Sequence, residues 1–272
     1  MEFIDKNQSA NREEAHEVID AFLKEVDAKP GLYMRFADPL PNGTFPKKQM
    51  FALLMREQCR CCYCMRRLQT NGLHLSIEHV IPQHAQIDEL EKYFAYGSTL
   101  DKALVQHEDD FLKGDKHTPP YPHTVAYENL VLSCDGVYPN SNEAQSCNTK
   151  RGSEFVPPVA FIREIHDNVE YYKNGDVRYL GKEEGMFPMV TILGLDVPIL
   201  KAIRRIWAYI LKHGIDVSNC VPEDVVFDIW KDVVGQVSQQ ESDVLLLFDR
   251  DNFWALLLQY DYFNNASVFV SI

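Results

Sequence analysis

The sequence contains no apolar run long enough to cross a membrane. Its longest runs, at residues 244–248 and 255–258, fall far short of the roughly 20 residues that a spanning helix needs. The sequence also has no repeats and no low-complexity stretches. Its N-terminus lacks a basic segment followed by an apolar one, so no secretory signal is expected. We therefore expect a protein of the cytoplasm, without membrane contact, whose 272 residues, 46% of them apolar, bury an ordinary globular core.

Basic charge is also scarce, because the formal net charge is -13. A protein that binds nucleic acid by itself normally presents a basic surface to the phosphates. The basic residues are concentrated, however, between residues 45 and 68, where Glu57 alone opposes Lys47, Lys48, Arg56, Arg60, Arg66 and Arg67. If the protein acts on nucleic acid, we expect a partner to supply much of the affinity.

The spacing of apolar residues predicts several helices. Residues 11–26 have helical spacing behind a candidate cap at Asn11, and residues 48–58 repeat the spacing after a Pro- and Gly-rich stretch at 30–46 that either wraps the core or separates domains. Residues 85–97 also have a helical pattern. Three further helices are expected at 198–213, 222–237 and 242–262.

Short strands and loops are expected between residues 61 and 148. Residues 73–81 alternate as a hairpin strand that ends at Pro82, and the polar, Pro-rich residues 107–122 indicate an exposed loop inserted into the core. A second hairpin is predicted at 169–180 with its turn at Asn174 and Gly175. These patterns indicate a mixed α+β fold in three segments, at residues 1–45, 46–156 and 157–272.

Seven cysteines in a reducing compartment favour a metal site over disulfides, particularly because four of them lie between Cys59 and Cys64. Two overlapping Cys-x2-Cys pairs are available there, Cys59 with Cys62 and Cys61 with Cys64. Cys134 and Cys147 can complete a set of four thiolates, which is typical of a structural zinc ion without an open position. Alternatively, the later cysteines are small buried apolar residues.

Three motifs together resemble the HNH endonuclease family. They are IEHVIP at 77–82, ENLVLSC at 128–134 and CNTKRG at 147–152, and the resemblance covers roughly residues 60–152. It implies a ββα-metal finger, braced by a zinc cluster, that is embedded here between N- and C-terminal helical segments. It also favours Cys61 and Cys64 as the first zinc pair, because the Cys-x-Tyr-Cys form recurs in this family.

The resemblance assigns roles to four residues. It implies that His79 is a general base, that Glu78 and Asn148 hold a divalent cation, and that Asn129 orients His79. A neutral imidazole can take a proton from water, and oxygen ligands suit Mg²⁺ or Mn²⁺. Phosphate contacts are expected from Lys150, Arg151 and His84, whereas His74, His107 and His123 are expected to be ordinary surface residues.

Three departures from compact HNH domains narrow the resemblance. Forty-nine residues separate His79 from Asn129, twelve separate Cys134 from Cys147, and Glu78 replaces the more frequent aspartate. With the segment NLVLSCDG at 129–136, these features are similar to the HNH subunit of Septu-type and retron-associated anti-phage defence systems. That family implies an ATPase partner of the ABC or SMC type.

Three functions remain open from the sequence. The first is a DNA endonuclease acting in such a defence complex. The second is an RNA-cleaving nuclease, for example one that acts on tRNA, with the same site. The third is a zinc-ribbon adaptor without catalytic activity.

Overall fold

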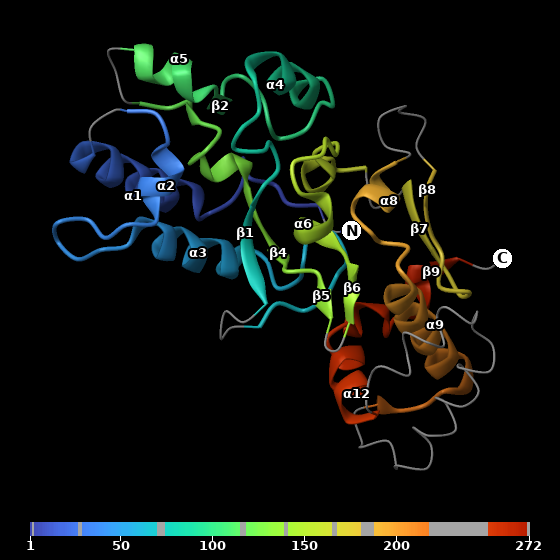
Figure 1. Cartoon of the computed structure of the whole chain (residues 1–272). Coiled ribbons are helices and arrows are strands. Elements are labelled where there is room, and N and C mark those ends of the chain that lie inside the picture. The colour runs from blue at the N-terminus through green and yellow to red at the C-terminus, as the bar shows by residue number, and fades with distance from the viewer. Residues whose placement is uncertain are drawn as a thin grey trace.

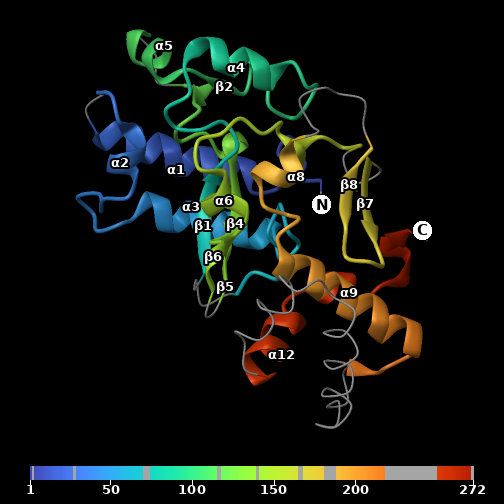
Figure 2. The same cartoon turned by 45° about the vertical axis from the view of Figure 1, so that its right-hand side comes forward.

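The computed structural model describes residues 1, 3–26, 29–69, 74–114, 118–138, 141–164, 168–180, 188–217 and 250–270. A strand pair lies at the centre of the molecule, with the N-terminal helices on one side and the C-terminal elements on the other (Figures 1 and 2). The architecture is mixed α+β with small sheets, so the predicted fold class is confirmed at that level.

The central pair consists of strand β1 (Leu75–His79) and strand β4 (Leu130–Cys134), which run antiparallel. Leu75 lies opposite Cys134, and His79 lies opposite Leu130. The register therefore places a cysteine at one end of the pair and the histidine at the other. Helix α6 (Cys147–Arg151) begins at the next cysteine and lies beside this pair in Figure 1.

A small hairpin accounts for the long interval between Cys134 and Cys147. Strands β5 (Val137–Tyr138) and β6 (Ser141–Gln145) pair antiparallel and return the chain to the end of β4. The hairpin begins at Gly136, which has a φ of +64°, and a Cβ at that position would lie 1.7 Å from the carbonyl oxygen of Ser146. Only glycine allows this close approach of the two backbones.

The N-terminal part contains three helices, α1 (Arg12–Glu25), α2 (Leu32–Phe36) and α3 (Pro46–Glu57). Helix α2 lies inside the Pro- and Gly-rich stretch and buries Leu32 and Phe36, so this stretch wraps the core. The predicted side-chain cap at Asn11 is wrong, because its amide donates to the backbone oxygen of Leu53 on α3 instead. Asn11 therefore joins two helices.

The insertion between β1 and β4 is folded, and the prediction of an exposed loop at 107–122 is wrong. It contains helix α4 (Ile87–Phe94), strand β2 (Val105–Gln106), helix α5 (Glu108–Lys113), strand β3 (Tyr121–Pro122) and the 3-10 helix η1 (Tyr127–Asn129). Glu108, Phe111 and Tyr121 are buried, and β2 pairs parallel with β3. These few residues are buried by contacts with distant segments. The polar composition of the surrounding sequence gives no sign of such contacts, so the loop prediction failed.

The C-terminal part contains the predicted hairpin, formed by β7 (Val169–Tyr172) and β8 (Val177–Tyr179), to which β9 (Phe269–Val270) adds as a parallel strand. Helix α9 (Pro198–His213) has the predicted bounds. The predicted helix at 222–237 lies outside the described residues. Helix α12 (Arg250–Leu258) lies within the helix predicted at 242–262 but ends before residues 259–262, which form a turn and the start of a 3-10 helix. The remaining elements are short: η2 (Val159–Phe161), α8 (Met189–Ile192), η5 (Asp261–Phe263) and η6 (Ala266–Val268).

One hydrophobic cluster includes residues from all three predicted segments, from Met1 to Phe269. Backbone hydrogen bonds also cross between the segments, because Ile4 N donates to Ala160 O at 2.8 Å and Arg67 N donates to Gln259 O at 2.6 Å. Among the helices that the structure describes, none combines the length and apolar character needed to cross a membrane.

Gly136 provides a test of the hairpin geometry. The Gly136→Ala substitution must move the Ser146 backbone as well as strain φ, so we expect it to lower the free energy of unfolding by more than about 3 kcal/mol. Gly97→Ala is the matched control, because Gly97 also has a positive φ but no atom within 4 Å of an added Cβ, and it should cost about 1–2 kcal/mol. Urea unfolding measures both values, and equal costs would contradict this account of the hairpin.

Candidate metal centre and active site

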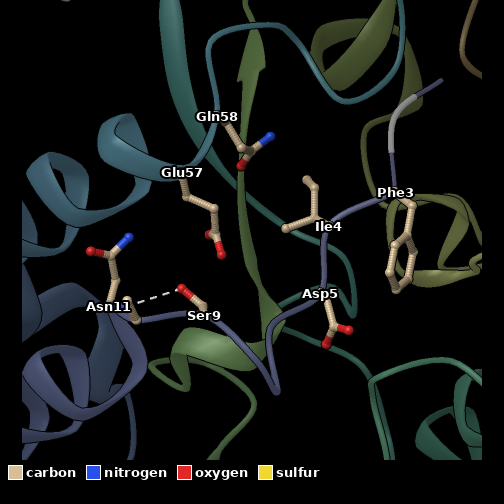
Figure 3. A pocket seen from close by; sticks show the side chains of 8 residues that line it. Phe3, Ile4, Asp5, Ser9, Asn11, Glu57 and Gln58 are labelled. Atoms are coloured by element: carbon tan, nitrogen blue, oxygen red, sulfur yellow. Dashed lines mark hydrogen bonds between the residues drawn. The ribbon is translucent and has the colours of Figure 1, made fainter.

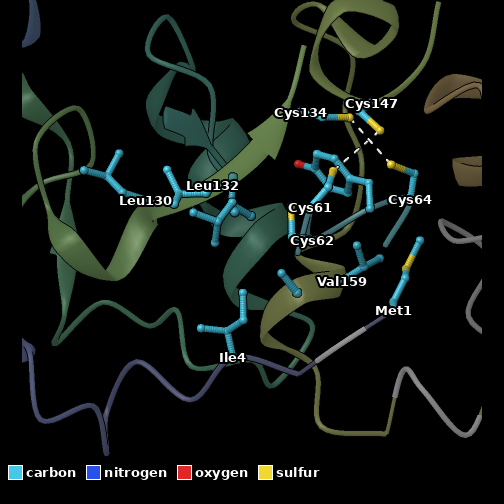
Figure 4. Packing of buried hydrophobic residues seen from close by; sticks show 14 of the residues in the cluster. Met1, Ile4, Cys61, Cys62, Cys64, Leu130, Leu132, Cys134, Cys147 and Val159 are labelled. Carbon is cyan, nitrogen blue, oxygen red and sulfur yellow. Dashed lines mark hydrogen bonds between the residues drawn. The ribbon is translucent and has the colours of Figure 1, made fainter. Parts of the chain in front are cut away.

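The sulfur atoms of Cys61, Cys64, Cys134 and Cys147 lie within 4.8 Å of one another, and all four residues are buried. The Cys61 and Cys147 sulfurs are 3.7 Å apart, and those of Cys64 and Cys134 are 3.6 Å apart. Figure 4 shows the four sulfur atoms facing one another. This grouping confirms the predicted four-cysteine cluster.

The dimensions of the cluster suit a tetrahedral ion. Zinc–sulfur bonds of about 2.3 Å at tetrahedral angles place the sulfurs roughly 3.8 Å apart, which agrees with the two short separations observed. Four thiol ligands select a soft ion over Mg²⁺ or Ca²⁺. The cluster could therefore hold a metal such as zinc.

Backbone hydrogen bonds shape the turn that carries the first cysteine pair. Cys61 N donates to Arg66 O at 2.7 Å, and Met65, with a φ of +68°, donates from its N to Cys61 O at 3.2 Å. Cys62 N donates to Leu132 O at 3.3 Å and so attaches the turn to β4. The turn thus presents Cys61 and Cys64 toward the end of the strand pair.

The competing register, Cys59 with Cys62, is not used. Cys59 is exposed and its sulfur accepts a bond from Arg60, whereas Cys62 is buried but lies outside the group of four. Burial raises the pKa of the Cys62 thiol well above its usual value, and a hydrogen bond to the Cys61 sulfur adds to this rise. Cys62 is therefore a neutral core residue.

The pKa values of the Cys61 and Cys147 thiols are shifted in opposite directions. Burial raises the pKa of Cys147 well above its usual value. Burial also acts to raise the pKa of Cys61, but hydrogen bonds from Cys134 and Cys147 outweigh it and lower that pKa well below its usual value. Since metal ligands must be thiolates, binding of a divalent cation should displace the remaining protons.

At the other end of the strand pair, Arg151 and Glu78 form a buried ion pair of 2.5 Å. The guanidinium also donates to His79 O at 3.0 Å, Val80 O at 2.6 Å and the Tyr63 hydroxyl at 3.2 Å. Arg151 is thus fully engaged inside the protein, and the prediction that it contacts a phosphate is wrong. Lys150 and His84 are exposed, and their phosphate contacts stay a prediction.

The two carboxylate oxygens of Glu78 differ in their contacts with the part of the chain that the structure describes. Arg151 and Tyr63 both donate to Oε1, and Oε2 accepts no bond from the residues that the structure describes. Burial raises the pKa of Glu78, and the Arg151 guanidinium opposes this rise. The carboxylate is therefore held in place through one oxygen, and the other can take a further ligand.

Asn148 lies on the same side of β1 as Glu78. Its Nδ2 donates to the Ser76 hydroxyl at 3.1 Å, and alternation along the strand puts Ser76 and Glu78 on one face, roughly 7 Å apart. Among the described residues, none donates to the Asn148 Oδ1. Both groups offer oxygen, the ligand type that Mg²⁺ and Mn²⁺ prefer, and the divalent cation expected between them stays a prediction.

His79 is buried, and its two ring nitrogens have different partners. Nε2 lies 2.9 Å from the backbone oxygen of Thr124, which can only accept, so Nε2 carries the proton and Nδ1 has the lone pair. The Gln83 side-chain amide donates to Nδ1 over 3.3 Å. Burial lowers the pKa of His79 to about 3, with further contributions from His123 and Lys47. The imidazole is therefore neutral at physiological pH.

Asn129 does not contact the imidazole, because its amide is fully used by the backbone. Oδ1 accepts from Ile81 N at 2.7 Å, and Nδ2 donates to Ile81 O at 2.9 Å and to His123 O at 2.6 Å. These bonds join the loop after His79 to the segment that carries Thr124. Any effect of Asn129 on the orientation of His79 is therefore indirect.

Several residues around these sites were not predicted from the sequence. Thr124 and Gln83 contact His79, and the Tyr260 hydroxyl lies 3.7 Å from the Cys64 sulfur. His123 was expected on the surface but is buried, and it stacks on His107 within the insertion. The Thr124 and Tyr260 contacts join segments far apart in the chain, so no local motif indicates them, whereas Gln83 lies only four residues after His79.

A pocket of about 340 Å³ opens beside the N-terminal segment, away from these residues (Figure 3). Its polar lining is largely satisfied by the protein, because Glu57 accepts bonds from Lys6 at 2.5 Å and from the Tyr127 hydroxyl at 2.9 Å. The lining contains none of the predicted site residues: Phe3, Ile4, Asp5, Ser9, Ala10, Asn11, Glu57 and Gln58. This pocket is not the candidate active site.

Comparisons of the chain with protein-family models, with curated proteins and with solved structures give no match.

Metal binding by the four cysteines can be tested by metal analysis of purified protein. We expect about one zinc per chain in the wild type, and loss of that ion together with a clear fall in thermal stability in Cys134→Ser, because a structural zinc contributes directly to folding. Cys59→Ser is the matched control, since Cys59 is exposed and outside the cluster. Equal metal content in both variants would rule the cluster out as the metal site.

The buried ion pair predicts that substitutions of Arg151 and of its neighbour Lys150 change the free energy of unfolding by very different amounts. Arg151→Met leaves the Glu78 carboxylate without its counter-charge and several carbonyls without a donor, so it should lower the free energy of unfolding by about 3–5 kcal/mol. Lys150→Met removes an exposed charge and should change it by less than about 0.5 kcal/mol. Denaturant unfolding compares the two variants, and similar values would contradict the structural role of Arg151.

Proposed function

We propose that the protein is a metal-dependent endonuclease of the HNH type that hydrolyses phosphodiester bonds in DNA. The observation that carries the proposal is the arrangement around β1 and β4. A neutral histidine with an accepting Nδ1 ends β1, and beside one face of the same strand lie two oxygens, from Glu78 and Asn148, that accept no hydrogen bond from the described residues. The four-cysteine cluster lies at the other end of the pair, and α6 runs from it to the Glu78 end, which is the arrangement expected of a zinc-braced ββα-metal finger.

In this proposal His79 draws a proton from the attacking water at Nδ1, while its Nε2–H stays bonded to the Thr124 carbonyl. The Gln83 bond to Nδ1 is long, at 3.3 Å, so a water can replace it. A bound phosphodiester would place negative charge near the imidazole and raise its low proton affinity. Thr124 thus keeps the correct tautomer through the reaction.

Glu78 and Asn148 would hold one Mg²⁺ or Mn²⁺ ion, which supplies electrostatic stabilisation of the departing oxygen. Arg151 holds the Glu78 carboxylate by Oε1 and leaves Oε2 for the ion. Lys150, which is exposed on α6, would contact a phosphate. The zinc in the cysteine cluster would have a structural role only, because all four of its positions are taken by sulfur.

We further propose that the nuclease works with an ATPase partner of the ABC or SMC type in anti-phage defence. The support is the resemblance of the motifs to the Septu and retron-associated subunits, together with the net charge of -13, which disfavours binding of nucleic acid by this chain alone. RNA cleavage at the same site is the alternative within the enzyme class.

A non-catalytic zinc-ribbon adaptor is the second candidate function. The observations that favour it are the burial of His79 and the engagement of Glu78 by Arg151, which both reduce access to the site. An adaptor would keep the metal cluster and the fold but would not depend on His79.

The proposed function predicts that His79→Ala strongly slows cleavage. Wild-type protein, with any ATPase encoded beside it, is given DNA and RNA in parallel with Mg²⁺ or Mn²⁺, and His79→Ala should reduce the cleavage rate at least about 100-fold by removal of the general base. His213→Ala is the control, because His213 is exposed at the end of α9. Cleavage of RNA alone would select the alternative substrate. If the wild type cuts neither polymer, the adaptor function is favoured.

A further inference from the structure

The imidazole of His79 is contacted by two segments that are far from it in sequence. The first is Thr124, whose carbonyl oxygen accepts from Nε2 at 2.9 Å. The second is Tyr33 on α2, whose ring meets the imidazole edge to face, with centroids 4.4 Å apart and an interplanar angle of 86°. Since β1 ends at His79, these two contacts hold the ring beyond the support of the strand pair.

One buried carboxylate binds both of these segments. Glu108 Oε2 accepts from the Thr124 hydroxyl at 2.5 Å. Its other oxygen, Oε1, accepts from Gly31 N at 2.5 Å and from Leu32 N at 3.3 Å, at the start of α2. Glu108 thus ties the residue that fixes the His79 tautomer to the helix that carries Tyr33.

The chemistry of this carboxylate points to a specific role. Glu108 is 8% exposed, and no cationic partner is found for it among the residues that the structure describes. A buried carboxylate without a counter-charge is costly unless hydrogen bonds satisfy it, and here two backbone amides and one hydroxyl do so. A leucine would fill the same space without this cost but would hold neither segment in place.

We propose that Glu108 is a positioning residue for His79, which it orients through Thr124 on one side and through α2 and Tyr33 on the other. This inference rests on the proposed function for its catalytic consequence, but its structural part stands on the contacts alone. The insertion between β1 and β4 then has a definite role, because its helix α5 supplies the group that aligns the general base.

Four substitutions separate this role from general packing. Glu108→Leu removes all three acceptor contacts, and Thr124→Val removes only the hydroxyl contact. Glu108→Gln can keep its oxygen on the backbone amides and turn its NH₂ toward the Thr124 oxygen, and Thr124→Ser keeps the hydroxyl, so these two should retain the function. Asp109→Asn is the control, because Asp109 is the neighbouring carboxylate, is exposed and lies outside these contacts.

The first readout does not need activity. In protein with ¹⁵N-labelled histidine, the nitrogen shifts of His79 should report the Nε2–H tautomer in the wild type, Glu108→Gln, Thr124→Ser and Asp109→Asn. The preference of His79 for the Nε2–H tautomer should be lost in Glu108→Leu and weakened in Thr124→Val. If Glu108→Leu fails to fold, Thr124→Val against Thr124→Ser still decides the question, because valine replaces the Thr124 hydroxyl by a methyl group, whereas serine keeps the hydroxyl and loses only the methyl group. An unchanged tautomer in every folded variant that lacks the contact overturns the proposal.

The second readout is cleavage of whichever polymer the wild type cuts. Glu108→Leu should lower kcat by roughly 10- to 100-fold and leave KM within about twofold, because a misaligned base affects the chemical step and not binding. Thr124→Val should show a smaller loss, and the two conservative variants should stay near the wild type. An unchanged kcat in Glu108→Leu overturns the positioning role of Glu108. If the wild type cuts neither polymer, the proposed function is refuted, and the tautomer measurement alone decides whether Glu108 positions His79.

Discussion

The buried guanidinium of Arg151 is the interaction on which the arrangement of the site depends. It joins α6 to the carboxylate of Glu78, to the backbone oxygens of His79 and Val80, and to the Tyr63 hydroxyl in the cysteine turn. Without it a charge and several carbonyls would be buried unpaired, at a cost of several kcal/mol. The same group therefore fixes the end of β1, the start of the following loop and the orientation of the helix that carries Asn148.

The cysteine cluster and the histidine occupy opposite ends of one strand pair, and different forces hold them. Hydrogen bonds within the turn and the close approach at Gly136 bring the four sulfurs to distances that a tetrahedral ion requires. His79, in contrast, is held by polar contacts from the insertion and from α2. A metal in the cluster would stiffen the end of the strand pair that carries Cys134. The contacts from the insertion hold the opposite end, which carries His79.

Much of the fold could be predicted from local patterns. The helix at 198–213, the hairpin with its turn at Asn174 and Gly175, and the grouping of four cysteines were all indicated by periodicity, turn residues and ligand spacing. Within the insertion, the helix at 85–97 was indicated by its apolar spacing, but the folded part at 107–122 was missed, because α5 is short and its surroundings are polar, so that only contacts with distant segments bury Glu108 and Phe111. The same limitation hid the buried state of His123.

The sequence by itself determined which chemical groups are present: the thiol ligands, the Glu78 and His79 pair, and the two asparagines. Only the tertiary structure decided how each group is used. It selected Cys61 and Cys64 over the overlapping pair, turned Arg151 inward to Glu78, and directed the amide of Asn129 to the backbone instead of to His79. The physical reason is that each choice depends on burial and on hydrogen-bond partners from segments tens of residues away, which spacing along the chain does not specify.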